Sequence, residues 1–348
     1  MKQTVALGLF SGGLDSILAC RVIAAQGIKV VALKFVTPFF DYDLLAKKDE
    51  YTAEVERKYG LDVELVNLSE GYLDLLRNPT HGFGKNFNPC IDCKILMLTR
   101  ARELMARYNA SFLVTGEVVG QRPMSQRRDT LRVIERDAGC AGILLRPLSA
   151  KLLVPTRAEQ EGLVDREQLY GFSGRGRKPQ MALAKALGIK DYPNAAGGCM
   201  LTDGNLGGRI EKYYAGAYTP DSQDISVDDV NLLLVGRQFL LFDKFWLVVG
   251  RDEKENDRIA SYWRPGDWLF EMTTHPGPTA LLRLGDAQIE GHRKEEVVNA
   301  AAGIVVSYSK KVNGEAIPAE VTVTTGRGRV SQMYKPLAGS KLQLWRIE

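Results

Sequence analysis

Six residues near the N-terminus, Ser11 to Ser16 (SGGLDS), lie between an apolar run and a helix-like pattern. Gly12 and Gly13 have no Cβ, so the backbone can turn tightly there and approach an anion closely. A helix that begins here presents free N–H groups and the positive end of its dipole, and both serines add hydroxyl groups. The spacing predicts a phosphate-binding loop; a plain tight turn before a capped helix is the alternative. Because Asp15 would repel phosphate, we expect it to act through Mg²⁺ or an amide.

Three of the five cysteines lie in loops flanked by proline or glycine: Cys90 and Cys93 form a Cys-x-x-Cys pair, and Cys199 follows two glycines. One such pair is compatible with a redox, a half-zinc or a structural role. Since thiolates prefer iron–sulfur centres or zinc, we expect these three to form one catalytic, metal-binding centre. The alternative is a persulfide on Cys93 or Cys199. Cys20 and Cys140 are predicted to be structural.

Basic residues are concentrated between residues 121 and 180. This segment contains 12 lysines and arginines but only 7 aspartates and glutamates, whereas the net charge of the whole chain is +4. A basic segment in a nearly neutral protein suits a phosphate-rich partner, although a solvated charged surface gives the same composition. We expect Arg127, Arg128, Arg175 and Arg177 to contact an RNA backbone.

The elements that position these residues alternate between strand and helix patterns, which predicts a doubly wound parallel α/β sheet over residues 1–150. Strands are expected at 4–10, 29–36, 62–68 and 111–116, and helices at 16–26, 44–59 and 93–109. Residues 151–221 are richer in loops, with one capped helix expected within 155–169, and are expected to complete the active site.

A change in character near residue 222 predicts a separate α+β domain over residues 222–348. Strand-like runs are expected there at 239–250, 279–285, 302–312, 319–325 and 341–345. The chain is 45% hydrophobic and 25% charged, has no apolar run of membrane-spanning length, and begins with a buried strand and not a secretion signal. We therefore expect a cytoplasmic protein with no membrane partner.

The Ser11–Ser16 loop resembles the SGG[VLM]DS loop of the ATP pyrophosphatases, or PP-loop enzymes. These enzymes split ATP between its α and β phosphates and adenylylate a substrate oxygen. The resemblance implies that Ser11, Gly12, Gly13, Asp15 and Ser16 bind the pyrophosphate portion of ATP, with Mg²⁺ on its phosphates.

The block from residue 90 to residue 131 is similar to the tRNA 4-thiouridine synthetases, whose TGE-x-x-GQ-x-x-SQ loop helps to bind the nucleotide. This resemblance implies nucleotide-binding roles for Gly116, Glu117 and Gln121. Members of the family with a Cys-x-x-Cys pair and a third cysteine are similar to those that carry a [4Fe–4S] cluster on three thiolates. The resemblance implies that Cys90, Cys93 and Cys199 would hold such a cluster here. The family usually has an RNA-binding region ahead of the PP-loop, so RNA binding is expected elsewhere in this chain. Residues 235–345 resemble the RNA-binding domain of NFACT proteins.

Together these features predict an enzyme that adenylates a uridine carbonyl oxygen of tRNA and replaces it with sulfur from a sulfide or cysteine-desulfurase donor. The expected product is 4-thiouridine, with 2-thiouridine as an alternative. An amide-forming PP-loop enzyme and a non-catalytic RNA-binding clamp are rival interpretations of the same residues. The three histidines do not lie beside a nucleophile, which disfavours Ser–His or Cys–His hydrolysis.

Overall fold

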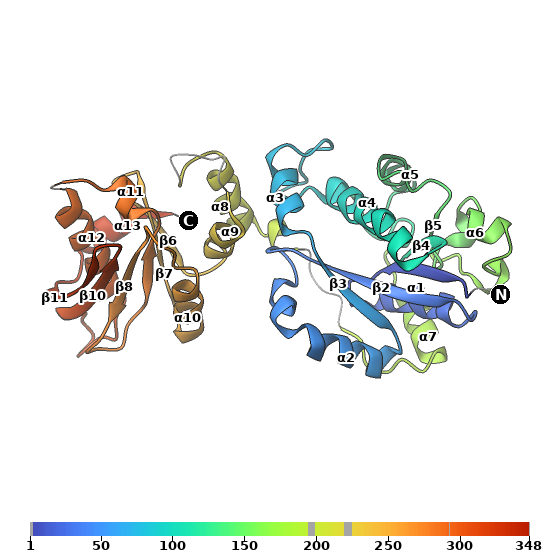
Figure 1. Ribbon diagram of the computed structural model, residues 1–348, viewed down its shortest axis with the longest axis horizontal. Coiled ribbons are helices and arrows are strands. Elements are labelled where there is room, and N and C mark those ends of the chain that lie inside the picture. The colour runs from blue at the N-terminus through green and yellow to red at the C-terminus, as the bar shows by residue number, and fades with distance from the viewer. Residues whose placement is uncertain (1–2, 194–198, 219–224, 292, 348) are drawn as a thin grey trace. The chain divides into compact units, whose positions relative to one another are not determined.

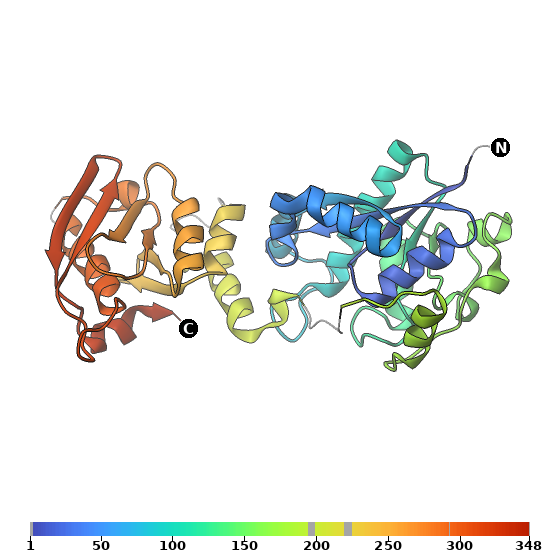
Figure 2. The same ribbon diagram turned by 90° about the horizontal axis from the view of Figure 1, so that it is seen from below.

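The computed structural model describes residues 3–193, 199–218, 225–291 and 293–347. The chain forms two compact units, Met1–Thr202 and Asp203–Glu348, each with its own sheet (Figure 1, Figure 2). In the described ranges, no helix is both long enough and apolar enough to cross a membrane.

The first unit contains a parallel five-stranded sheet in the order β3-β2-β1-β4-β5. Its strands are β1 Val5–Leu9, β2 Lys29–Val36, β3 Asp62–Asn67, β4 Phe112–Thr115 and β5 Leu144–Leu145. This arrangement confirms the predicted doubly wound α/β fold. The strand order reverses between β1 and β4, so the loops after these two strands meet at the point where such sheets bind ligands.

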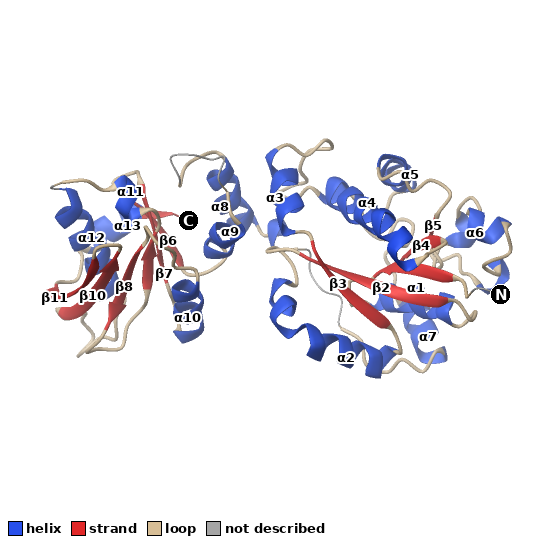
Figure 3. Ribbon diagram, viewed as in Figure 1, coloured by secondary structure: helices blue, strands red, loops and turns tan. Residues whose placement is uncertain are grey.

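Helices cover both faces of this sheet (Figure 3). Apolar side chains of α1 (Leu14–Ala24), α2 (Lys48–Tyr59) and α7 (Lys178–Ala186) share one core with the sheet. Side chains of α4 (Cys90–Tyr108) and α5 (Arg128–Asp137) form the core on the opposite face. The remaining elements of the unit are η1 Tyr42–Lys47, α3 Ser69–Arg77, η2 Ala150–Leu152, α6 Arg157–Gln160, η3 Arg166–Gln168 and η4 Met200–Thr202.

The single helix expected within 155–169 is replaced by two short turns, α6 and η3. The expected cap is present, because Thr156 and Glu159 form a capping box. The helix cannot continue because Gly162 adopts a left-handed conformation with φ of 71°.

The second unit is built on an antiparallel seven-stranded sheet in the order β11-β10-β8-β9-β7-β6-β12, which confirms the predicted C-terminal α+β domain. The strands are β6 Arg237–Leu241, β7 Phe245–Val249, β8 Trp268–Met272, β9 Ala280–Leu282, β10 Ala319–Thr325, β11 Gly328–Tyr334 and β12 Arg346–Ile347. The helices are α8 Gly204–Tyr214, α9 Val227–Leu233, α10 Glu253–Ser261, α11 Gly285–Gln288, α12 Arg293–Ser307 and α13 Gly339–Trp345.

Two strand predictions in this unit are wrong, because residues 302–307 end α12 and residues 341–345 lie in α13. Helix α12 packs on the sheet and is buried almost continuously from Ala300 to Val306. A short apolar run that is buried all round has no periodicity that separates a helix from a strand.

The residues set apart as a loop-rich extension are divided between the two units at Thr202. The physical reason is an aromatic cluster in the second unit. The rings of Tyr213 and Tyr218 each lie 5.5 Å from the ring of Trp246 in β7, and all three side chains are buried. Helix α8 is thereby fixed to the second core.

Candidate active site

The Ser11–Ser16 loop connects β1 to α1 and is shaped for an anion. Gly12 has a left-handed φ of 82°, and Gly13 caps α1 in an extended conformation without a side-chain hydrogen bond to the helix. The Ser16 hydroxyl donates to the Gly13 carbonyl at 2.8 Å, and the Ser11 hydroxyl lies 3.2 Å from that of Ser16. The backbone turn and two hydroxyl groups are therefore held together at a helix N-terminus, as phosphate binding requires.

Asp15 connects this loop to the loop that follows β4. Gln121 Nε2 donates to Asp15 Oδ2 at 2.9 Å, which is the amide-bonded role that the sequence suggested. Asp15 Oδ1 and Gln121 Oε1 are buried and have no hydrogen-bond partner among the described residues. Buried oxygens without partners are uncommon, and these two can accept a ligand proton, a water molecule or a cation.

Gly116 allows the two loops to touch. A Cβ atom at this position would lie 2.5 Å from the backbone carbonyl carbon and oxygen of Asp15. No side chain fits at that distance, so the backbone of the second loop can approach the start of α1 only through glycine.

Glu117, which follows Gly116, is held in place by the buried side chain of Arg146. Arg146 Nε donates to Glu117 Oε2 at 3.1 Å, while its Nη1 donates to Glu135 Oε2 at 2.8 Å. The side chains of Arg146 and Glu117 are 3% and 2% exposed, so their charges depend on this pairing. Glu117 Oε1 lacks a hydrogen-bond partner within the described residues.

Lys34 is a site residue that the sequence reasoning missed. Its ammonium group donates to the Ser11 carbonyl at 2.7 Å and to Asp41 Oδ2 at 2.6 Å, although the residue is only 3% exposed. A lysine within an otherwise apolar strand of a parallel sheet was the available signal, because lysine is almost never buried without a partner. Lys34 places a positive charge directly behind the loop.

The three loop cysteines lie in one neighbourhood around Tyr72 of α3. The Tyr72 hydroxyl hydrogen-bonds to Cys93, and burial, followed by the proximity of Cys93 and Cys199, raises the pKa of Tyr72 well above its ordinary value. Burial also raises the pKa of the Cys93 thiol to about 12 and raises the pKa of Cys199. Cys90 accepts a hydrogen bond from Asn88 Nδ2 at 3.2 Å.

The three loop thiols are near one another, but they are not arranged as the ligands of a metal ion. All five cysteines are free, and the described part of the chain contains no group of three His, Cys, Asp or Glu side chains positioned to hold a metal ion. Residues 194–198, which include the glycines before Cys199, lie outside the described residues.

The four arginines expected to bind RNA have different surroundings. Arg127, Arg128 and Arg175 are all exposed, and Arg127 is paired with Asp129 at 3.1 Å. Arg177 is half-buried at the start of α7, and its Nε has no hydrogen-bond partner in the described ranges. The segment before Arg177 is hydrogen-bonded to the loop after β4, because Gly174 N donates to the Val119 carbonyl at 2.8 Å.

Two family models match the chain. Residues 1–151 match the model of the thiamine biosynthesis protein (ThiI), and residues 236–346 match the NFACT protein RNA binding domain. The chain therefore joins a ThiI-type domain to an NFACT-type RNA-binding domain. The ThiI-type domain contains the phosphate loop, the Asp15–Gln121 contact, Cys90 and Cys93. No curated protein matches the chain in sequence.

Among solved structures, a 4-thiouridine synthetase in complex with RNA and bound ATP is 22% identical, with a TM-score of 0.37. The match covers 53% of this chain and only 41% of the synthetase chain. The U34-tRNA thiolase NcsA from Methanococcus maripaludis, with its [4Fe–4S] cluster, is 18% identical over 67% of this chain and 73% of its own, with a TM-score of 0.32. The C-terminal part of the fibronectin/fibrinogen-binding protein from Streptococcus suis is 12% identical over 88% of this chain and 100% of its own, with a TM-score of 0.28.

Proposed function

We propose that this protein is an ATP-dependent tRNA sulfurtransferase that converts a uridine to a thiouridine, with 4-thiouridine as the product. One observation carries the proposal. In a ThiI-type domain, Asp15 and Gln121 join the loops after β1 and β4 through a 2.9 Å hydrogen bond, beside an uncapped helix N-terminus. The site therefore combines an anion-binding turn with buried acceptor oxygens at the switch point of the sheet.

The nucleotide half of the reaction uses the Ser11–Ser16 loop. The N-terminus of α1 and the two serine hydroxyls bind the β and γ phosphates of ATP, and Lys34 supports the loop from behind. Asp15 Oδ1 and Glu117 Oε1 are buried oxygens without partners in the part of the chain that is described. Carboxylate oxygens suit Mg²⁺, so these two would hold the ion on the phosphates.

The chemistry proceeds in two displacements. The carbonyl oxygen of the uracil ring attacks the α-phosphorus, the bond from that phosphorus to the bridging oxygen breaks, and pyrophosphate leaves. The oxygen is now part of AMP, which is a good leaving group. A sulfur nucleophile then adds to the ring carbon that carries this oxygen, and AMP departs. Hydrosulfide gives the thiocarbonyl directly after loss of its proton. A cysteine persulfide first gives a disulfide between the protein and the base; a second cysteine thiol attacks the protein sulfur of that disulfide, which releases thiouridine and leaves a protein disulfide to be reduced before the next turnover. Positive groups fixed at the loop stabilise the charge that develops on the phosphates.

The sulfur half is assigned to Cys90, Cys93 and Cys199. Cysteine sulfur is the donor that iron–sulfur clusters use, and these three cysteines lie in one neighbourhood around Tyr72, which hydrogen-bonds to Cys93. To hold a cluster, the three thiols would have to lose their protons and move into a closed set, because they do not form one in this structure. A [4Fe–4S] cluster on three cysteines would supply one iron that is open to hydrosulfide. A persulfide on Cys93 or Cys199 is the alternative form of the same assignment.

The RNA partner is assigned to tRNA, bound in part by the C-terminal domain, because residues 236–346 match an RNA-binding family model. A sulfide-producing donor supplies the sulfur atom.

Nucleoside mass spectrometry tests the proposal directly. Protein prepared without oxygen is incubated with ATP, sulfide and unmodified tRNA, and the digested nucleosides are compared with 4-thiouridine and 2-thiouridine standards. We expect 4-thiouridine to appear together with pyrophosphate and AMP. Release of pyrophosphate with no sulfur in the tRNA would redirect the assignment to an amide-forming enzyme, and absence of ATP turnover would favour a non-catalytic clamp.

A further inference from the structure

A basic groove lies beside helix α5, on the open edge of the parallel sheet. It encloses about 530 Å³ between α5 and residues 150–156, and the two residues of β5, Leu144 and Leu145, contribute to its wall. We name this cavity the α5 groove. It lies outside the phosphate loop and the cysteine neighbourhood, and the proposed chemistry does not use it.

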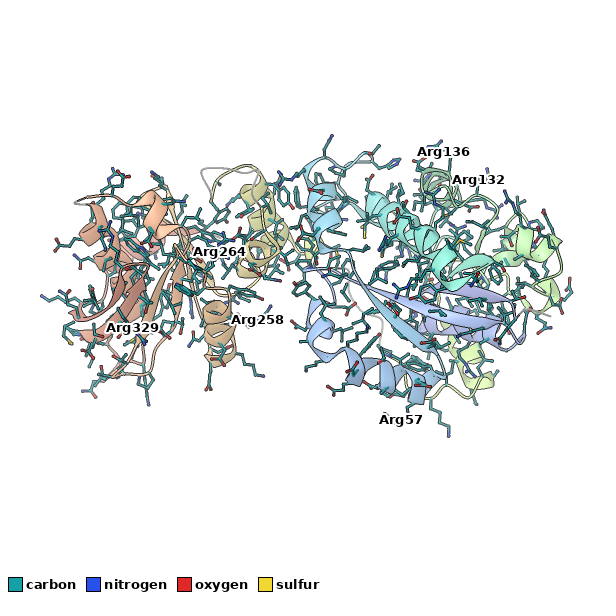
Figure 4. The ribbon with its side chains drawn as sticks, viewed as in Figure 1. Arg57, Arg132, Arg136, Arg258, Arg264 and Arg329 are labelled. Atoms are coloured by element: carbon teal, nitrogen blue, oxygen red, sulfur yellow. The ribbon has the colours of Figure 1, made fainter. Side chains whose placement is uncertain are left out.

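Three arginines of α5 line the groove at intervals of four residues: Arg128, Arg132 and Arg136. Residues four apart lie on the same side of a helix, about 6 Å apart along its axis. All three residues are exposed, and Figure 4 shows Arg132 and Arg136 projecting from α5. Lys151 lines the groove from the segment that faces the helix.

The charge of this groove is not balanced by its own acids. Glu135 is paired with Arg146 at 2.8 Å, and Glu159 with Arg166. Arg136 and Lys151 each contact one carboxylate, whereas no ion pair is found for Arg128 or Arg132 among the described residues.

Like charges four residues apart destabilise a helix, so the arginine row opposes the folding of α5. The acids of α5 that lie near this row are paired with other arginines, Asp129 with Arg127 and Glu135 with Arg146. Arg128 and Arg132 are thus left without an ion pair among the described residues, which points to an external anion as their partner.

The groove is also connected to the nucleotide site. Arg146 lines the groove and is hydrogen-bonded to Glu117, which follows Gly116 in the loop that touches Asp15. The buried side chain of Arg146 therefore links a polymer bound in the groove to the proposed ATP site.

We propose that the α5 groove binds the sugar–phosphate backbone of the tRNA substrate, with Arg128 and Arg132 as its phosphate contacts. The inference rests on the proposed function and adds a second RNA-binding surface, separate from the C-terminal domain. A row of cations along one helix follows successive phosphates of a strand, whereas a single small anion would need only one of them.

The experiment measures tRNA affinity of the full chain over a range of salt concentrations. Arg128→Ala and Arg132→Ala are compared singly and together with wild type. Arg57→Ala is the matched control, because Arg57 is an exposed arginine on another helix, α2 (Figure 4). Arg128→Lys/Arg132→Lys retains the charge. ATP affinity and the thermal midpoint are recorded for each variant.

We expect each alanine substitution to weaken tRNA binding severalfold and to lower the slope of log K against log salt by about one. The double variant should lose both contacts, the lysine variant should recover most of the affinity, and Arg57→Ala should match wild type. The thermal midpoint should stay constant or rise, because a repulsion is removed; a structural role would lower it.

If wild type binds tRNA and the double alanine variant binds with the same affinity and salt slope, the groove does not hold RNA, and an acidic protein becomes its partner. If wild type itself does not bind tRNA, both the proposed function and the assignment of tRNA to the α5 groove are wrong. The two failures are thus distinguishable.

Discussion

Asp15 shows how one side chain can both organise and serve a site. One of its oxygens accepts from Gln121 and thereby orders two loops, while the other is buried and has no partner among the described residues. A carboxylate that only stabilised the fold would have both oxygens satisfied. We therefore propose that the partner of the second oxygen is the Mg²⁺ ion that accompanies the nucleotide.

Replacing Asp15 by alanine removes the loop contact and the proposed Mg²⁺ ligand together. We expect ATP-dependent pyrophosphate release to fall by about two orders of magnitude or more, with the circular dichroism spectrum unchanged. Asp129→Ala, which removes an exposed carboxylate outside the loop, is the control. Turnover of Asp15→Ala close to wild type would exclude the pyrophosphatase assignment.

The three loop cysteines give a second prediction at this scale. After anaerobic reconstitution, wild type should contain iron and sulfide in the ratio of a cubane cluster, and Cys199→Ala should contain much less. Cys140→Ala should match wild type, because Cys140 is fully buried in the core between the sheet and helices α4 and α5 and is not one of the three loop cysteines. Equal iron in Cys199→Ala, with thiolation intact, would refute the three-cysteine centre and favour the persulfide.

At the scale of elements, α1 packs so closely on β1 that a Cβ at Gly8 would lie 2.6 Å from Cys20 Sγ. This burial raises the pKa of Cys20 from 9.0 to about 12. Between these values the unfolded thiol has lost its proton while the folded one keeps it. The unfolded state then binds fewer protons, so stability falls as pH rises, by about 1.4 kcal/mol per pH unit for this group.

Cys20→Ala should therefore give a flatter dependence of unfolding free energy on pH between pH 9 and 11 than wild type. Urea unfolding followed by circular dichroism measures it. All four tryptophans follow residue 203, so their fluorescence reports the second unit and should not distinguish the two proteins. Parallel pH curves by circular dichroism would contradict the burial effect.

Elements whose sequence has a clear period or a turn signal could be predicted, and buried or long-range features could not. Four of the five parallel strands were predicted because each apolar run ends at glycine or a polar loop, as 111–116 does. Strand β5 was not predicted, because its two residues are too few for a pattern. Helix α12 was missed because its buried residues hide the helical period. Gly116 and Gln121 were expected near the nucleotide from a motif, but their contacts with Asp15 join residues about a hundred positions apart. Lys34 and Arg146 gain their importance from partners that only the fold brings together.

At the scale of the whole molecule, the chain divides its tasks between two units with separate cores. A chain ending at Thr202 should still bind ATP, because the whole Ser11–Gln121 contact network lies within the first unit. Its tRNA affinity at fixed salt should fall, since the NFACT-type domain is removed. Unchanged tRNA affinity would remove the RNA-binding role from the second unit; lost ATP affinity would mean that the first unit does not act alone.

Arg146 divides its guanidinium between two carboxylates, one in the nucleotide loop and one in the wall of the α5 groove. Anything that draws Glu135 or Glu117 away changes how firmly the other is held. Thermodynamic linkage makes such an effect reciprocal: if an occupant of the groove tightens ATP binding by some factor, ATP tightens the occupant by the same factor. If ATP and tRNA bind as proposed, the contacts of Arg146 with both carboxylates are the route by which binding of one ligand would change the affinity for the other.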